Sequence, residues 1–177
     1  DNNKVSEIKL RFGYHHQMAR NVFQLNQGDQ GFADIALMTN TYATDWSWSV
    51  LLEDYDLDGR NDIFISNGIY KRPNDLDYIN YLSNINLTLY SDVEQDSIER
   101  ALIDRIPSVK IPNQAFRQLS AYEYQEVSDQ WGLDAETYSN GTAFGDLDND
   151  GDLDLVINNI NQPALLYKNT AVDSGKS

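Results

Sequence analysis

The chain has 177 residues, 41% of them hydrophobic and 11% aromatic, which is enough for one ordinary domain with a core and argues against disorder. Its formal net charge of −15 argues against nucleic acid or an anionic membrane surface as a partner, and the absence of any run of 18 apolar residues argues against membrane insertion. Since the chain has no cysteine, disulfides and thiolate metal sites are excluded, and any metal must be bound by oxygen or histidine ligands.

Residues 14–68 read as a first repeat unit made of four strands. The segments are short, rich in Val, Ile, Phe and Tyr, and bounded by Gly, Asn and Asp, which is typical of strands. The predicted strands lie at 22–26, 32–36, 48–53 and 62–66. The last is a nearly continuous apolar run, so we expect it to be covered on both faces.

Two pairs of side chains in this unit have both a functional and a structural interpretation. The adjacent His15 and His16 could bind a transition metal or act as a base, but no third ligand is evident nearby, and a structural or rim role is the alternative. Trp46 and Trp48 are two residues apart and would face the same way on a strand, where they could stack on a sugar or pack between blades.

The loop between the last two strands of this unit carries the strongest chemical signal. Residues 54–62 read Asp-Tyr-Asp-Leu-Asp-Gly-Arg-Asn-Asp. Carboxylates at positions 1, 3 and 5 converge when the backbone curls around a cation, and Gly at position 6 permits the sharp turn. A backbone carbonyl at position 7 and a carboxylate at position 9 can complete an oxygen cage suited to Ca²⁺, whereas Mg²⁺ prefers a strict octahedron and retained water. The predicted ligands are Asp54, Asp56, Asp58, the backbone carbonyl of Arg60, and Asp62.

Residues 69–112 have no counterpart elsewhere in the chain and read as a helical insertion. Ser91 and Glu94 fit a capping box, apolar residues follow at helical spacing, and Pro107 ends the helix. Residues 75–85 predict a second, weaker helix, which gives a helical hairpin on one rim of a propeller. The tyrosines of the insertion would line a binding rim or anchor the helices; they are Tyr78, Tyr81 and Tyr90.

Residues 113–160 repeat the first unit in the same order. The predicted strands lie at 115–119, 124–128, 141–145 and 154–158. The loop at 146–154 reads Asp-Leu-Asp-Asn-Asp-Gly-Asp-Leu-Asp, so it has the same ligand spacing as the first loop. Its predicted ligands are Asp146, Asp148, Asp150, the backbone carbonyl of Asp152, and Asp154. Residues 161–170 read as the start of a further unit.

The spacing of the two units predicts propeller blades. The loops are 92 residues apart, and removing the 44 residues of the insertion leaves 48, close to the roughly 40–50 residues of four-stranded blade repeats. Propellers need about 4–8 blades to close, so two units alone cannot form one. We therefore expect an all-β fragment of a larger propeller, completed by further blades of the same or another chain.

The sequence disfavours two alternatives to a calcium loop. An EF-hand needs an acidic residue at position 12 and flanking helices, but position 12 is Ile65 or Ile157 and the flanks read as strands. A metal-free turn is disfavoured because four carboxylates within nine residues repel one another strongly. Two bound Ca²⁺ ions would change the formal charge from −15 to −11, and we expect their role to be structural.

Residues 140–155, supported by 44–49 and 165–169, resemble an FG-GAP (VCBS-type) repeat, the blade unit of integrin α-subunit propellers. The layout of residues 14–170 is similar to FG-GAP proteins with an ASPIC/UnbV-type end, which are common as secreted or surface proteins of Bacteroidota. The resemblance implies a calcium-binding propeller located outside the cell, in the periplasm or on the outer-membrane surface. Leu52 and Glu53 depart from the Phe-Gly that is usual before the first loop.

The functional hypothesis is a non-catalytic module that recognises a protein or glycan ligand. No Ser-His-Asp order, phosphate-binding loop or nucleophile elbow is present in the sequence. The alternatives are a polysaccharide-cleaving enzyme of lyase type, with His15 or His16 and tyrosines at the rim, and a purely structural part of a larger surface assembly.

Overall fold

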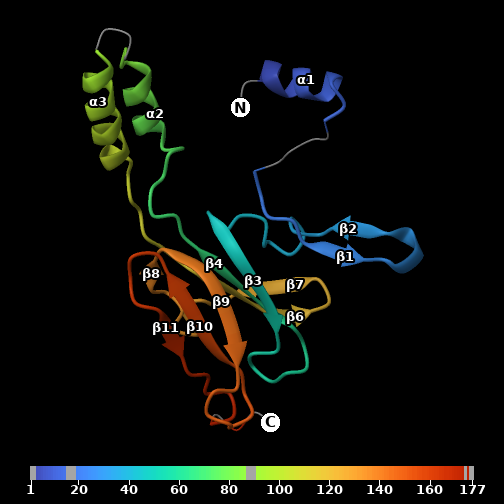
Figure 1. The fold of residues 1–177 in the computed structure, drawn as a ribbon. Coiled ribbons are helices and arrows are strands. Elements are labelled where there is room, and N and C mark those ends of the chain that lie inside the picture. The colour runs from blue at the N-terminus through green and yellow to red at the C-terminus, as the bar shows by residue number, and fades with distance from the viewer. Residues whose placement is uncertain (1–2, 15–18, 87–90, 174, 176–177) are drawn as a thin grey trace. The chain divides into compact units, whose positions relative to one another are not determined.

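The computed structural model describes residues 3–14, 19–86, 91–173 and 175. The chain divides into two compact units, Asp1–Ala43 and Thr44–Ser177. Both are built from small antiparallel sheets with a few helices, as Figure 1 shows, which confirms the all-β expectation in its coarse form. No closed propeller is formed by the described residues, so the propeller itself is not confirmed.

The first unit contains a helix and a short hairpin. Helix α1 (Asn3–Arg11) was not predicted, and the sequence offers no acidic first turn to mark its start. Strands β1 (Gln24–Asn26) and β2 (Phe32–Asp34) pair antiparallel around a 3₁₀ turn η1 (Gly28–Gln30). Both strands are shorter than expected, because the Asp34 side chain accepts hydrogen bonds from backbone amides on either side of the hairpin and ends the ladder.

The second unit contains a four-stranded antiparallel sheet in the order β3-β4-β6-β7. Its strands are β3 (Ser47–Glu53), β4 (Asp62–Asn67), β6 (Gln114–Ser120) and β7 (Glu123–Glu126). All six residues of β4 are buried, which confirms the prediction of a strand covered on both faces. Phe64 of β4 lies opposite Leu51 on one side and Ala115 on the other.

A three-stranded sheet in the order β11-β10-β9 follows. Its strands are β9 (Ser139–Gly145), β10 (Asp154–Asn159) and β11 (Leu165–Tyr167), and a small sheet pairs β5 (Ile111–Pro112) with β8 (Glu136–Thr137). The sheets do not follow the boundaries of the sequence units. The four-stranded sheet joins the last two strands predicted within 14–68 to the first two predicted within 113–160.

The two larger sheets pack together through one apolar core. Phe64, Ala115 and Val127 belong to the four-stranded side, and Leu155 and Ile157 belong to the three-stranded side. The Ser49 and Thr142 hydroxyls form a 2.6 Å hydrogen bond between β3 and β9. The loop after β3 and the loop after β9 therefore both extend from this pair of packed sheets.

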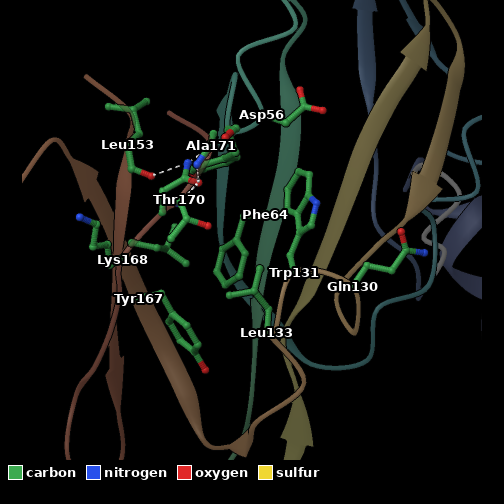
Figure 2. A pocket seen from close by; sticks show the side chains of 13 residues that line it. Asp56, Phe64, Gln130, Trp131, Leu133, Leu153, Tyr167, Lys168, Thr170 and Ala171 are labelled. Atoms are coloured by element: carbon green, nitrogen blue, oxygen red, sulfur yellow. Dashed lines mark hydrogen bonds between the residues drawn. The ribbon is translucent and has the colours of Figure 1, made fainter. Parts of the chain in front are cut away.

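A cavity of about 310 Å³ opens beside this core. Trp131, Phe64 and Tyr167 are among the residues that line it, as Figure 2 shows. Tyr55 also lines it and packs edge-to-face on Trp131, with ring centroids 6.4 Å apart. Asp56 borders the cavity too, so the cavity adjoins the first acidic loop.

The insertion forms the predicted helical hairpin, with helices α2 (Leu76–Ser83) and α3 (Asp92–Arg105). The Asp75 carboxylate caps α2 by accepting the Tyr78 amide at 2.9 Å, and the Ser91 amide donates to Glu94 at the start of α3. The buried Tyr78 hydroxyl donates to the Leu102 carbonyl at 3.0 Å, so this tyrosine anchors the two helices. Tyr81 is more exposed and lies under the Arg105 guanidinium, and Tyr90 lies outside the described residues.

Candidate metal centres

Two groups of three aspartates could each hold a metal ion. One lies between β3 and β4 and the other between β9 and β10, and within each group one oxygen per residue lies within 4.8 Å of the others. The first group is Asp54, Asp56 and Asp58, and the second is Asp146, Asp148 and Asp150. These six residues are predicted ligands that the structure brings together in two triads.

The backbone of the first loop turns around its own carboxylates. Asp54 accepts the amide of Asp58 at 3.0 Å on one oxygen and the amide of Gly59 at 2.8 Å on the other. Asp58 accepts the amide of Arg60 at 3.0 Å. Leu57 and Gly59 have φ angles of 57° and 85°, so position 6 needs the glycine that the motif predicts.

The second loop repeats this pattern bond for bond. Asp146 accepts the amides of Asp150 and Gly151 at 3.1 and 3.2 Å, and Asp150 accepts the amide of Asp152 at 3.2 Å. Asn149 and Gly151 take positive φ angles of 62° and 98°, at the same two positions as in the first loop. The sequence repeat therefore produces one local structure twice.

The two position-9 carboxylates, Asp62 and Asp154, are used in the same way as each other. Asp62 accepts the amides of Tyr55 at 3.2 Å and Gln118 at 2.9 Å, one on each oxygen. Asp154 accepts the amides of Leu147 at 3.0 Å and Asn169 at 2.8 Å in the same manner.

Asp62 thus joins the first loop to β6, and Asp154 joins the second loop to the residues just after β11. Neither carboxylate belongs to a triad. Their role as metal ligands stays a prediction. The same holds for the backbone carbonyls of Arg60 and Asp152.

Burial controls the electrostatics of the first loop. Asp62 is 0% exposed, and burial raises the pKa of its carboxyl to about 6, against the two backbone hydrogen bonds that lower it; the nearby charge of Asp56 adds to the rise. Partial burial also acts to raise the pKa of Asp58, but hydrogen bonds from Arg117 and the Arg60 amide hold it below its ordinary value.

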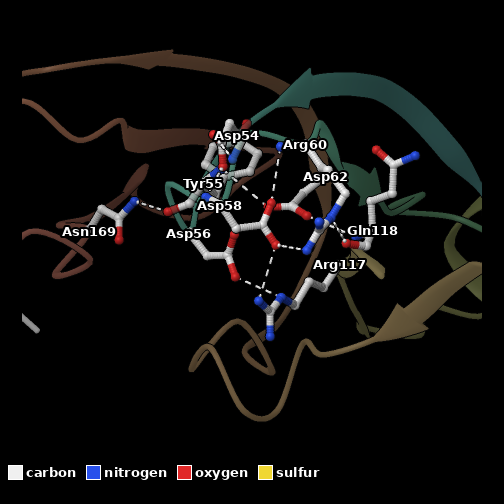
Figure 3. Close-up of polar contacts among 10 residues, drawn as sticks. Asp54, Tyr55, Asp56, Asp58, Arg60, Asp62, Arg117, Gln118 and Asn169 are labelled. Atoms are coloured by element: carbon white, nitrogen blue, oxygen red, sulfur yellow. Dashed lines mark hydrogen bonds and ion pairs between the residues drawn. The ribbon is translucent and has the colours of Figure 1, made fainter. Parts of the chain in front are cut away.

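Basic side chains sit against both triads (Figure 3 shows the first). Arg117 Nε lies 2.6 Å from an Asp56 oxygen, and its Nη2 lies 3.1 Å from Asp58. Arg60 Nη2 lies 2.6 Å from the same Asp58 oxygen.

In the second loop Lys168 Nζ lies 2.5 Å from Asp148 and 3.4 Å from Asp150, and hydrogen bonds to these carboxylates raise the pKa of the lysine. Each triad is therefore paired with a cationic side chain from a later segment of the chain: Arg117 of β6 for the first and Lys168, just after β11, for the second.

Sequence reasoning missed these cations, although a signal was present. Phe116-Arg117-Gln118 and Tyr167-Lys168-Asn169 both read aromatic, basic, amide. Phe116 pairs with Ile63, and Tyr167 pairs with Leu155, so each triplet starts one residue beyond its position-9 aspartate in the ladder.

The two loops are also joined to each other. The Asn169 amide group donates to the carbonyl of Tyr55 in the first loop at 2.8 Å and to that of Leu153 in the second at 3.3 Å. Its backbone amide is the one accepted by Asp154. One side chain thus fixes the separation of the two candidate centres.

The sequence also singled out a pair of histidines and a pair of tryptophans. His15 and His16 lie outside the described residues. Trp46 precedes β3, whereas Trp48 lies on it, is 55% exposed, and donates its ring N–H to the Gly68 carbonyl. Because the register of β3 also shifts between Ser47 and Ser49, the two tryptophans do not share the regular strand segment on which the expected pair depends.

Comparison with known proteins adds no identification. No known protein family matches the chain, and no curated protein is significantly similar to it. None of the described helices is both long and apolar enough to cross a membrane. What the fold and the sites define is a mostly-β chain with two equivalent acidic loops that could hold metal ions.

Proposed function

We propose that this chain is a calcium-binding, non-catalytic part of a β-propeller that recognises a protein or glycan outside the cell. The observation that carries the proposal is the pair of acidic loops, which share their spacing, their positive φ angles and their internal hydrogen bonds. Two independent copies of one such arrangement favour a common ligand over a chance cluster of acids.

Calcium is the ion best suited to these loops. The chain has no thiolates, and the ligands available in the triads are carboxylate oxygens. Ca²⁺ takes 6–8 oxygen ligands in irregular geometry, whereas Mg²⁺ favours strict octahedral sites with several waters. A loop of this kind can add backbone carbonyls and water to its carboxylates and satisfy Ca²⁺.

The role of the ion would be to stabilise the fold. Each loop connects two strands and is bonded through its position-9 aspartate to the following strand segment. A cation that neutralises the triad would remove the repulsion that strains this junction, so its binding free energy would add to the free energy of unfolding.

The repeated loop, the stacked antiparallel sheets and the resemblance of residues 140–155 to an FG-GAP repeat all support the propeller part of the proposal. The helical hairpin of residues 69–112 would supply the recognition surface, because it is the one segment without a counterpart in the repeat. Further blades, from this or another chain, would complete the ring.

Thermal unfolding in calcium and in EDTA tests the metal part. We expect calcium at about 100 times its Kd to raise the melting temperature by roughly 5–10 °C, because an ion bound to the folded state alone stabilises it by mass action. Magnesium at the same concentration is the control and should give a smaller rise. Equal melting temperatures in calcium and EDTA would refute the proposed calcium binding.

A glycan and protein-ligand screen with and without residues 69–112 tests recognition. Unchanged binding after the deletion would contradict the assignment of the recognition surface to these residues.

A further inference from the structure

The two loops are equivalent in backbone but opposite in charge at position 7. The first loop has Arg60 there and the second has Asp152. Both side chains reach the segment that follows the loop. Arg60 Nε donates to the Gln118 carbonyl at 3.0 Å, and Asp152 accepts the Val172 amide at 3.1 Å. The two loops therefore share the same backbone structure but carry opposite side-chain charges at position 7.

In the first loop two guanidinium groups form ion pairs with the aspartates. Arg117 bridges Asp56 and Asp58, and Arg60 pairs with Asp58. The four aspartates of this loop face two arginines, which leaves two uncompensated negative charges. A metal ion that binds in this loop must displace these guanidinium groups or bind against their electrostatic repulsion.

The second loop is less compensated. Its five aspartates face one lysine, Lys168, which is half-exposed and leaves four uncompensated negative charges. The same ion gains more Coulomb energy in this loop than in the first.

Asp152 gives a second, independent observation that points to a cation in this loop. Its side chain is only 1% exposed, and one carboxylate oxygen accepts the Val172 amide. The other oxygen, Oδ1, is buried without a hydrogen-bond partner, and the side chain lies against the carboxylate of Asp150 in the triad. A buried carboxylate oxygen without a partner is costly unless a cation or donor reaches it.

We infer that the two centres bind calcium with unequal affinity and that the second loop fills first. In the second loop, the carboxylate of Asp152 adds a negative charge at the ion. The first loop fills later, because the guanidinium groups of Arg60 and Arg117 already neutralise part of its negative charge. This inference rests on the proposed calcium function. It assigns Asp152 a side-chain role, where the motif alone predicts only its backbone carbonyl.

The test is calorimetric titration of the whole chain with CaCl₂, using variants that isolate each loop. Asp56→Ala leaves the second loop, and Asp148→Ala leaves the first. We expect the second loop to bind at least about tenfold more tightly than the first. Far-ultraviolet circular dichroism and the melting temperature verify that each variant is folded.

Exchanging the position-7 residues provides the matched control. Arg60→Asp in the Asp148→Ala chain should tighten the first loop by about tenfold, and Asp152→Arg in the Asp56→Ala chain should weaken the second by a similar factor. Arg117→Gln gives a second route to the first loop and should tighten it too.

The outcomes separate the inference from the function beneath it. Two loops of equal affinity, or a first loop that fills before the second, would overturn the inference while leaving calcium binding intact. Position-7 exchanges without effect on either affinity would also overturn it. Absence of calcium heat in every chain would overturn both.

Discussion

Asp62 joins its loop to a neighbouring strand, and the sequence motif predicts it as a metal ligand as well. It is buried, its two oxygens accept amides from its own loop and from the next strand, and burial raises its pKa to about 6. In the absence of a metal the charged form is therefore held at a cost. A nearby cation would relieve that cost, which is the physical reason for expecting metal to strengthen this junction.

The raised pKa of Asp62 predicts a pH dependence in EDTA. The folded chain binds this proton more tightly than the unfolded chain, whose Asp pKa is near 3.8. The contribution of Asp62 to the free energy of unfolding is therefore fully present below pH of about 4 and is lost as the pH rises through about 6. Urea unfolding at pH 5 and pH 7 measures it.

Asp62→Asn should remove this contribution and flatten the difference between the two pH values. The comparison uses the change between pH values within each chain, so the hydrogen bond that Asn cannot accept does not affect it. An unchanged pH difference in the variant would contradict the assignment. With calcium present the trend should reverse, because a proton and the ion compete for the same loop.

At the scale of elements, the contact between the two large sheets depends on a close approach of backbones. A Cβ added at Gly68, which follows β4, would lie 2.5 Å from the Ser139 nitrogen and 2.6 Å from the Tyr138 carbonyl carbon. Backbone atoms cannot move aside as a flexible side chain can. The absence of a side chain at Gly68 therefore allows β9 to start against the end of β4.

Gly68→Ala should lower the free energy of unfolding by about 1–3 kcal/mol, the usual cost of forcing atoms into a filled contact. The control is Gly141→Ala in β9, where an added Cβ meets nothing within 4 Å. Urea unfolding in calcium buffer measures both. A Gly68→Ala chain as stable as the Gly141→Ala chain would show that the sheets adjust freely at this contact.

The elements also show what sequence can and cannot predict. The loops were predicted from local spacing, because carboxylates within nine residues can converge without help from the rest of the chain. Helix α3 was predicted from a cap and a helical spacing, which are equally local, and α2 was predicted as a second, weaker helix. Arg117 was not predicted as a partner because it is 59 residues from Asp58, and the ladder between β4 and β6 alone brings them together.

Sheet membership was harder to predict than strand location. The repeat marks where a pattern recurs, but it does not state which strands form hydrogen bonds with each other. Strands from both sides of the insertion therefore share one sheet, although the sequence placed them in separate units. Helix α1 went unpredicted because its first turn carries no acidic residue to mark where it begins.

At the scale of the molecule, the strong acidity has a local explanation. Nine of the 28 acidic residues lie in two loops, and these loops are held at a fixed separation by Asn169 within the second unit. Filling both centres with calcium would lower the formal charge from −15 to −11. A large share of the net negative charge therefore lies in these two loops, which the sheets position.

The central claim is that each acidic loop binds one calcium ion. Equilibrium dialysis of the purified chain against saturating calcium, followed by elemental analysis, counts the ions directly. We expect two calcium ions per chain, falling to one in either Asp56→Ala or Asp148→Ala. A chain that retains no calcium above the dialysis buffer would contradict it.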